Sequence, residues 1–287
     1  MSLIPHYPFT PKTIGLDGQT LSYLDEGQGP ALVMLHGNPT WSFFYRNLVL
    51  GLRSEFRVIV PDHMGCGLSS KPQHYPYTLA THIANLTTLI DTLQLTDLSL
   101  MVHDWGGAIG MGYAGRHPQQ IRSLIITNTA AFPSPHIPWR IKVCRWPLLG
   151  ALLVRGLNGF AGPAVTMAVA KRLDTTVAAG FLMPYDSWAN RVAVHAFVRD
   201  IPMSPNHPSW KTLLGVEASL SSLQEKPMLL IWGGRDFCFN DIFYREWLRR
   251  FPRARRHYLP QAGHYLLEDA GAEILPLVHD FFRENAS

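Results

Sequence analysis

The sequence has few of the features that mark several classes of protein. Its three cysteines, Cys66, Cys144 and Cys238, are odd in number and widely spaced in a chain of 287 residues. We therefore expect a reducing compartment and no disulfide framework. No Cys/His pair has the spacing of metal ligands, so we expect no metal site. The first residues show neither a charged start nor an apolar run, which predicts no signal peptide and a cytoplasmic protein.

Charge and long apolar runs are scarce as well. Charged residues make up 16% of the chain and the formal net charge is +4. Without a basic cluster interleaved with aromatic residues, we expect no nucleic-acid partner. The most apolar segment, 147–170, is interrupted by Arg155, Asn158, Pro163 and four glycines. A membrane-spanning helix needs about 20 residues without a central charge, so we predict that this segment does not span a membrane.

Segment 147–170 then has two interpretations. The simpler one, which we favour, is a buried helix. The other is an exposed apolar surface that contacts a partner, a membrane surface or a long-chain substrate.

Short apolar runs alternate with helical patterns along most of the chain. A hairpin is expected around Leu16–Gln19. We predict strands at 31–35, 56–60, 98–102, 123–127 and 228–232 and a short strand at 257–259. Helices are predicted at 41–52, 79–93, 108–116, 241–251 and 271–283. This alternation favours an α/β fold with a mostly parallel central sheet flanked by helices.

The alternation stops at Phe132. Pro133, Pro135 and Pro138 follow, and from there to about residue 225 we find helical stretches and no buried-strand pattern. The sequence therefore predicts a core domain of residues 1–132 and 226–287, with an inserted helical cap at 133–225.

Segment 102–107, Val-His-Asp-Trp-Gly-Gly, joins a predicted strand to a predicted helix. A strand–turn–helix of this kind, with small residues in the turn, is typical of a nucleophile elbow. The presented residue is most often Ser, but here it is Asp104. A carboxylate can displace a leaving group from a saturated carbon and hold that carbon as an ester. A simpler interpretation is an Asp that caps the next helix.

Two later residues complete a catalytic triad. Asp236 follows strand 228–232, and His264 lies in the turn after strand 257–259. The carboxyl ends of parallel strands meet in one crevice, so the imidazole of His264 can face Asp104, activate water and be oriented by Asp236. Each residue alone is an ordinary loop residue. The order nucleophile, acid, base is the one expected when these residues act together.

A departing anion needs N–H donors in a dry pocket. Trp105 carries an indole N–H directly after Asp104, and Asn38 carries an amide in the loop after an earlier strand. We predict that these side chains bind a halide or similar anion and that their backbone N–H groups form an oxyanion hole. The simpler roles are core packing for Trp105 and a turn before Pro39 for Asn38.

Segment 36–40, His-Gly-Asn-Pro-Thr, together with segment 102–107, Asp236 and His264, resembles the haloalkane dehalogenases of the α/β-hydrolase superfamily. The resemblance implies that Asp104 attacks a halogen-bearing carbon and that His264-activated water releases an alcohol, with no cofactor. One subgroup of that family carries its acid as Glu after the preceding strand. Asn128 stands there, so the chain resembles the subgroup with an Asp acid and an Asn-plus-Trp halide site.

The same residues also resemble the β-lactone decarboxylases of bacterial olefin synthesis, and segment 132–140 with the apolar stretch after it does so particularly. This resemblance implies a long-chain cis-β-lactone as substrate and a cis-alkene as product. Because the halide pair is intact, we rank the dehalogenase first by a small margin and the decarboxylase as the alternative. The small apolar substrate would contact Phe132, Trp139, Tyr185 and Trp188.

Three further functions are weaker. An epoxide hydrolase needs acidic donors, usually two cap tyrosines, and only Tyr185 is a candidate. A fluoroacetate-type enzyme needs arginines after the nucleophile to bind a carboxylate, where Gly106 and Gly107 stand. A non-catalytic binding module would show gaps in the triad, and none is found.

Overall fold

The computed structural model describes residues 4–285. Within these residues, one eight-stranded sheet has the strand order β1-β2-β4-β3-β5-β6-β7-β8. Its strands are β1 (Lys12–Leu16), β2 (Gln19–Glu26), β3 (Ala31–Leu35), β4 (Arg57–Pro61), β5 (Leu98–Asp104), β6 (Ile121–Thr129), β7 (Met228–Gly233) and β8 (Arg255–Leu259). Strand β2 pairs antiparallel with β1 and β4, and the other neighbours are parallel. The predicted mostly parallel sheet is confirmed.

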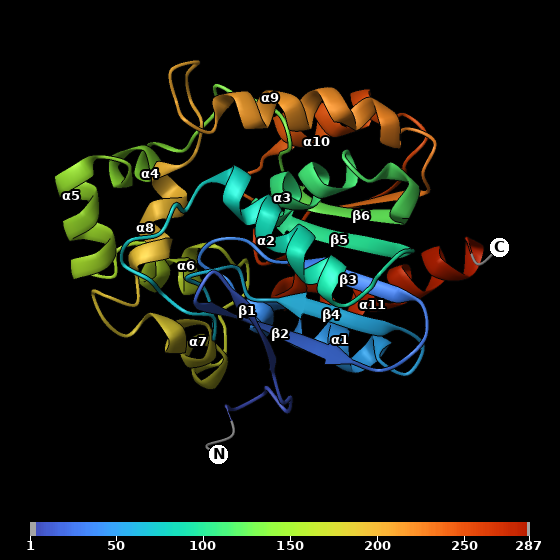
Figure 1. Ribbon diagram of the computed structural model, residues 1–287, viewed down its shortest axis with the longest axis horizontal. Coiled ribbons are helices and arrows are strands. Elements are labelled where there is room, and N and C mark those ends of the chain that lie inside the picture. The colour runs from blue at the N-terminus through green and yellow to red at the C-terminus, as the bar shows by residue number, and fades with distance from the viewer. Residues whose placement is uncertain (1–3, 286–287) are drawn as a thin grey trace.

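Helices cover both faces of this sheet (Figure 1). The helices of the chain are α1 (Arg46–Leu52), α2 (Leu79–Thr92), α3 (Trp105–Ala114), α4 (Trp139–Cys144), α5 (Pro147–Ala151), α6 (Ala161–Met167), α7 (Thr175–Leu182), α8 (Val192–Arg199), α9 (Trp210–Ser219), α10 (Asp241–Arg250) and α11 (Leu266–Glu284). Residues of α2, α3, α9 and α10 share one apolar core. Those of α1 and α11 belong to a second core on the opposite face.

The central strands are buried because both faces of the sheet are covered. Every residue of β5 is buried, and in β3 only Ala31 is partly accessible. Strands covered on both faces read as continuous apolar runs rather than alternating ones, which is why these segments could be predicted as strands.

Some boundaries differ from the predicted ones. Helix α3 begins at Trp105, directly after the strand, and therefore includes Gly106 and Gly107. The predicted helix at 41–52 starts as a 3₁₀ turn over Ser42–Tyr45 and continues as α1. Glycines have low helix propensity, so the sequence pattern placed the start of α3 too late.

Between β6 and β7, the described chain is helical, from α4 to α9. The elements α4–α8 lie at one end of the sheet, with α5 at the far end of the molecule's long axis (Figure 1). Helix α9 packs on α2 and α3 instead. The division into a core and a cap at 133–225 stays a prediction, and these contacts associate α9 with the sheet layers.

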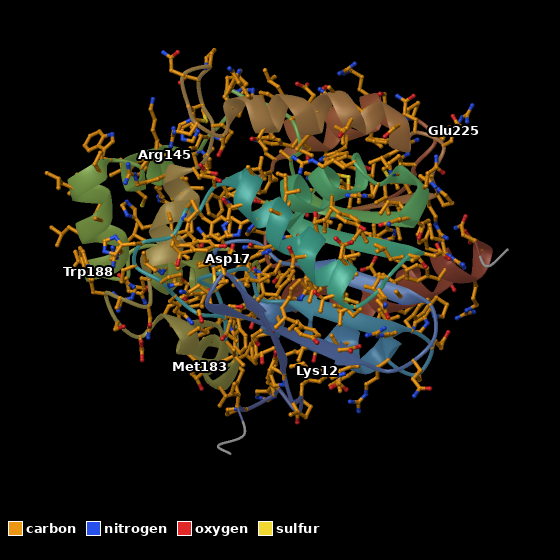
Figure 2. The ribbon with its side chains drawn as sticks, viewed as in Figure 1. Lys12, Asp17, Arg145, Met183, Trp188 and Glu225 are labelled. Atoms are coloured by element: carbon orange, nitrogen blue, oxygen red, sulfur yellow. The ribbon has the colours of Figure 1, made fainter. Side chains whose placement is uncertain are left out.

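The favoured interpretation of segment 147–170 as a buried helix is wrong. It folds as α5, a π-helical turn at Leu152–Gly156, and α6. Leu148, Leu152 and Leu157 are exposed, and side chains of α5 extend outward in Figure 2. No single described helix is long and apolar enough to cross a membrane, although Pro147–Gly156 and Ala161–Met167 pass that test as a pair bent by 70°.

Candidate active site

Asp104 lies at a strained bend between β5 and α3. Its backbone has φ 51° and ψ −126°, a conformation that non-glycine residues rarely adopt. The bend is possible because glycines surround it: a Cβ on Gly106 would collide with the carbonyl oxygen of Leu35, and one on Gly37 with the Asp104 carboxylate. This is the geometry of a nucleophile elbow.

The two carboxylate oxygens of Asp104 have different surroundings. Oδ1 accepts the backbone N–H of Asn38 at 2.8 Å, and the backbone N–H of Trp105 also donates to the carboxylate. Oδ2 lies 3.7 Å from Nε2 of His264. Burial raises the pKa of Asp104, while His264 and the two N–H donors act in the opposite direction. One oxygen is therefore held and the other is available to react.

His264 is tied to Asp236, as the predicted triad requires. Its Nδ1 lies 2.7 Å from Oδ2 of Asp236, and Oδ1 of Asp236 accepts the backbone N–H groups of Cys238 at 2.6 Å and Phe239 at 3.0 Å. Burial acts to lower the pKa of His264, but the neighbouring carboxylates, first Asp236 and then Asp104, hold that pKa above its usual value. Because Nδ1 donates to Asp236, Nε2 faces the nucleophile.

His103, which the sequence analysis did not single out, contacts His264 and helps to hold it in place. Its Nε2 donates to the carbonyl oxygen of His264 at 2.9 Å, and the two rings lie 4.5 Å apart. Burial lowers the pKa of His103 well below the usual value, so the ring is neutral. A histidine directly before the nucleophile, at the end of a predicted strand, is the signal that could have identified it.

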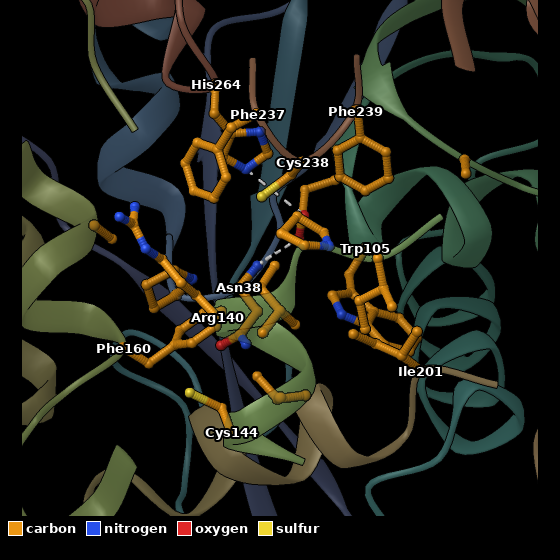
Figure 3. Close-up of a pocket in the computed structure, with 18 of the residues that line it drawn as sticks. Asn38, Trp105, Arg140, Cys144, Phe160, Ile201, Phe237, Cys238, Phe239 and His264 are labelled. Atoms are coloured by element: carbon orange, nitrogen blue, oxygen red, sulfur yellow. Dashed lines mark hydrogen bonds and ion pairs between the residues drawn. The ribbon is translucent and has the colours of Figure 1, made fainter. Parts of the chain in front are cut away.

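Asn38 and Trp105 both line the cavity in front of Asp104. Nδ2 of Asn38 donates to the carbonyl oxygen of Val194 on α8 at 3.1 Å, which leaves its second hydrogen available. The Trp105 ring packs 5.2 Å from that of Phe197. The structure thus brings together the five residues of the predicted triad and anion site, of which Asn38, Trp105 and His264 are labelled in Figure 3.

The cavity measures about 410 Å³ and is mostly apolar. Such a volume and lining are typical of small-molecule sites. Phe132 and Trp139 line it, as predicted. Residues that the sequence analysis missed also line it: Arg140, Cys144, Phe160, Ile201, Phe237, Cys238 and Phe239 (Figure 3). Arg140 and Cys144 come from α4 and the others from loops, Phe160 directly before α6, and no local pattern specifies the positions of these segments.

Tyr185 and Trp188 were predicted to contact the substrate, but the structure places both outside this cavity. Tyr185 is fully buried and its hydroxyl donates to the carbonyl oxygen of Thr40 at 3.2 Å. Trp188 is exposed and lies under the guanidinium of Arg155. In each case a local contact holds the ring away from the cavity.

Asn128 stands where one dehalogenase subgroup carries its catalytic acid, but here it has a structural role. Its Oδ1 accepts the N–H of Gly233 at 2.7 Å, and its Nδ2 donates to the carbonyl oxygen of the same glycine at 3.0 Å. This pair of bonds joins the ends of β6 and β7 and so positions the loop that carries Asp236.

The arrangement can perform nucleophilic displacement at carbon. It provides a buried carboxylate with one free oxygen, an oriented imidazole, N–H donors and an apolar cavity. Within residues 4–285, no group of three or more His, Cys, Asp or Glu side chains could hold a metal ion.

Comparison with known proteins places these features in a family. A family model described as alpha/beta hydrolase fold matches residues 30–271. The chain is 42% identical to a cis-3-alkyl-4-alkyloxetan-2-one decarboxylase of Shewanella oneidensis, over 96% of this chain and 89% of that protein. It is 40% identical to the enzyme of that name from Xanthomonas campestris, over 98% of each.

Similarity to haloalkane dehalogenases is more distant. Haloalkane dehalogenase 2 of Mycobacterium bovis is 29% identical over 96% of each chain. The crystal structure of haloalkane dehalogenase DbeA from Bradyrhizobium elkani superposes with a TM-score of 0.87 at 24% identity, covering 97% of this chain and 100% of that one. At that identity the superposition shows the common fold alone.

Proposed function

The chain belongs to the α/β-hydrolase fold family, and from this premise we propose that it is a β-lactone decarboxylase acting on cis-3,4-dialkyl-oxetan-2-ones. The observation that carries the proposal is the free Oδ2 of Asp104 at an apolar cavity of about 410 Å³, in a chain 42% identical to a decarboxylase of that class over nearly its whole length. This proposal reverses the order that the sequence motifs favoured, in which the dehalogenase came first.

In the first step, Oδ2 of Asp104 attacks C4, the saturated ring carbon bonded to the ring oxygen. The C4–O bond breaks and its electron pair stays on the oxygen, which becomes part of a free carboxylate on C3. The product of this step is an alkyl ester of Asp104. Attack inverts the configuration at C4.

In the second step, the bond between C3 and the carboxylate breaks. Its electrons form the C3=C4 double bond, and the ester bond to C4 breaks to return the Asp104 carboxylate. The products are carbon dioxide and an alkene. Elimination from an anti arrangement after inversion places both alkyl chains on the same side, which gives the cis-alkene. The steps balance without water, an external proton or a cofactor.

The remaining site residues stabilise the negative charges that develop during these two steps. The backbone N–H of Asn38 holds Oδ1 of Asp104, and the backbone N–H of Trp105 also donates to the carboxylate. Oδ2, which faces His264, is the oxygen that we assign to attack on the substrate. The side-chain N–H groups of Asn38 and Trp105 stabilise the ring oxygen as negative charge develops on it. In its protonated form, His264, oriented by Asp236, stabilises the carboxylate of Asp104, with the Nε2–H directed to the oxygen released when the ester bond breaks.

Haloalkane dehalogenation is the second candidate, because the two side-chain donors beside Asp104 are also those that a departing halide needs. The ester would then be hydrolysed by water that His264 activates. Epoxide hydrolysis is disfavoured, since the only candidate cap donor, Tyr185, is committed to the Thr40 carbonyl.

A direct comparison of substrates tests the proposal. The purified chain is incubated at equal concentration with 1-bromobutane and with a long-chain cis-3,4-dialkyl-β-lactone. We expect cis-alkene and carbon dioxide from the lactone at a kcat/KM at least about 100-fold above that for bromide release, a difference of about 2.7 kcal/mol in activation free energy. Efficient bromide release with no alkene would instead establish the dehalogenase.

A further inference from the structure

The segment from α4 to α6 exposes seven large apolar side chains, and we call the surface that they form the α4–α6 face. Its exposed side chains are Trp139, Trp146, Leu148, Leu149, Leu152, Leu157 and Met167. Leu148 is 89% exposed, and Trp139 and Leu157 are 70% exposed. Large apolar side chains exposed together in this way are uncommon on a protein surface and mark a contact with another apolar phase.

The charged residues within the segment that forms the α4–α6 face have one sign. Residues 105–173 contain no Asp or Glu, whereas the part from 139 to 172 carries Arg140, Lys142, Arg145, Arg155, Lys171 and Arg172. Arg140, Lys142, Lys171 and Arg172 are exposed, and Figure 2 shows Arg145 at the same end of the molecule. Basic residues beside exposed tryptophan and leucine are the composition that binds the interface of an anionic membrane.

The cavity opens at this face. Trp139, Arg140 and Met167 line the cavity and are also exposed, so they surround its mouth. The guanidinium of Arg140 lies 5.4 Å from the Trp139 ring and 3.9 Å from the sulfur of Met167. The apolar lining of the active site therefore continues directly onto the α4–α6 face.

We propose that the α4–α6 face docks on the surface of an anionic phospholipid bilayer, with the cavity mouth against the acyl region. This inference rests on the proposed function for its purpose, because a lactone and an alkene with two long alkyl chains partition into lipid. Docking would let the substrate enter the cavity and the product leave without crossing water. Trp139 and Trp146 would lie at the interface, where tryptophan is enriched in membrane proteins.

The test measures binding to vesicles without any substrate. The full chain is floated with vesicles of phosphatidylglycerol and phosphatidylcholine in equal parts, and with pure phosphatidylcholine vesicles. We expect binding to the anionic vesicles that weakens as salt rises, and at least about tenfold weaker binding to the neutral ones. Brominated acyl chains should quench part of the tryptophan fluorescence.

A triple variant, Leu148→Ser, Leu152→Ser and Leu157→Ser, removes apolar area from the face without touching a residue that lines the cavity. Its partitioning onto anionic vesicles should fall by at least about tenfold. A matched control, Leu50→Ser, Leu214→Ser and Ile242→Ser, changes exposed residues on α1, α9 and α10. The control should bind as the wild type does, and melting temperatures of both variants check that they are folded.

Binding and catalysis fail separately in this design. The variant Asp104→Asn should bind vesicles like the wild type, because it leaves the face intact. Alkene formation without vesicle binding would overturn the docking proposal and leave the function standing. Vesicle binding without alkene formation would overturn the proposed function and leave the docking proposal standing. A dimer that the Leu→Ser triple variant dissociates, with no vesicle binding, would assign the face to a second copy of the chain.

Discussion

At the scale of single residues, Asp104 combines nucleophilicity with strain. Its backbone adopts a positive φ, Oδ1 is bound by the Asn38 N–H, and burial raises the pKa of the carboxyl. The positive φ and the burial of the carboxylate each cost folding stability, whereas the hydrogen bond from Asn38 offsets part of that cost and fixes the orientation of the carboxylate. Sites of this kind trade stability for activity.

We predict that Asp104→Asn lowers kcat by at least about 1,000-fold, or about 4 kcal/mol. The amide keeps the shape and an acceptor for the Asn38 N–H but cannot attack carbon. Because a buried charge is removed, the melting temperature should stay equal or rise. Alkene yields and calorimetry measure the two effects. Full activity in this variant would refute the covalent mechanism.

His264 distinguishes the two candidate reactions. Hydrolysis of an ester needs a neutral base, whereas elimination of carbon dioxide needs none. We predict that His264→Gln lowers halide release from 1-bromobutane by about 100- to 10,000-fold and traps the butyl ester, visible in the intact protein mass. Alkene formation from the lactone should fall less, by about tenfold, with no adduct mass.

The pH profile of the wild type also tests whether His264 acts as a base in halide release but not in alkene formation. The pKa of His264 is raised, so the imidazole becomes protonated as pH falls through a value above that of free histidine, and halide release should fall with it. Alkene formation should persist to lower pH, until the carboxylate of Asp104 is protonated. Parallel acid limbs for both reactions would contradict the proposed mechanism.

At the scale of elements, the active site depends on how closely α3 approaches β3. Gly106 sits in the first turn of α3, and a Cβ there would collide with the backbone of Leu35. Backbone cannot move aside as a flexible side chain can. The start of α3, and with it the aim of Asp104, therefore depends on the absence of a side chain at this position.

We predict that Gly106→Ala destabilises the protein by about 1–3 kcal/mol, as overpacking does, and lowers the melting temperature by about 2–4 °C per kcal/mol. Gly215→Ala is the matched control: it is exposed within α9 and a Cβ meets nothing within 4 Å. That change should stabilise by about 0.5–1 kcal/mol. Thermal unfolding of both variants measures the difference, and an equal effect in both would show that the close approach is unimportant.

At the scale of the whole molecule, four histidines lie buried in the core around the site: His36, His63, His82 and His103. Burial lowers the pKa of all four, that of His63 to about 4. Both ring nitrogens of His82 lack a hydrogen-bond partner within the described residues, and its ring stacks on Phe197 at 4.4 Å. The native protein thus keeps these groups uncharged where an unfolded chain would protonate them.

It follows that each such histidine destabilises the fold as pH falls below about 6.5, by about 1.4 kcal/mol per pH unit, since the unfolded state binds the proton and the native state does not. We predict that His82→Leu reduces the loss of unfolding free energy between pH 7 and pH 5 by about 2 kcal/mol. Urea unfolding at both pH values measures this. The exposed His74→Leu is the control, and an unchanged pH dependence in His82→Leu would contradict the prediction.

Sequence patterns alone were enough to predict the family, the parallel sheet and the residues that meet at the candidate site. Strands such as 98–102 can be predicted from sequence because a strand covered on both faces is a nearly continuous apolar run. Asp104, Asp236 and His264 each follow a strand, and parallel strands bring their carboxyl ends to one edge. Local chemistry and strand order therefore sufficed to predict that these residues meet.

The surroundings of the site could not be predicted in this way. The contact of His103 with His264 depends on how the loop after β8 returns to the end of β5. Whether Leu148 is buried and whether Tyr185 faces the cavity depend on how the helices between β6 and β7 pack on the sheet. Those helices are short and apolar on more than one side, so no periodicity marks a single buried face. Their positions are set by contacts between residues distant in sequence, which local patterns do not encode.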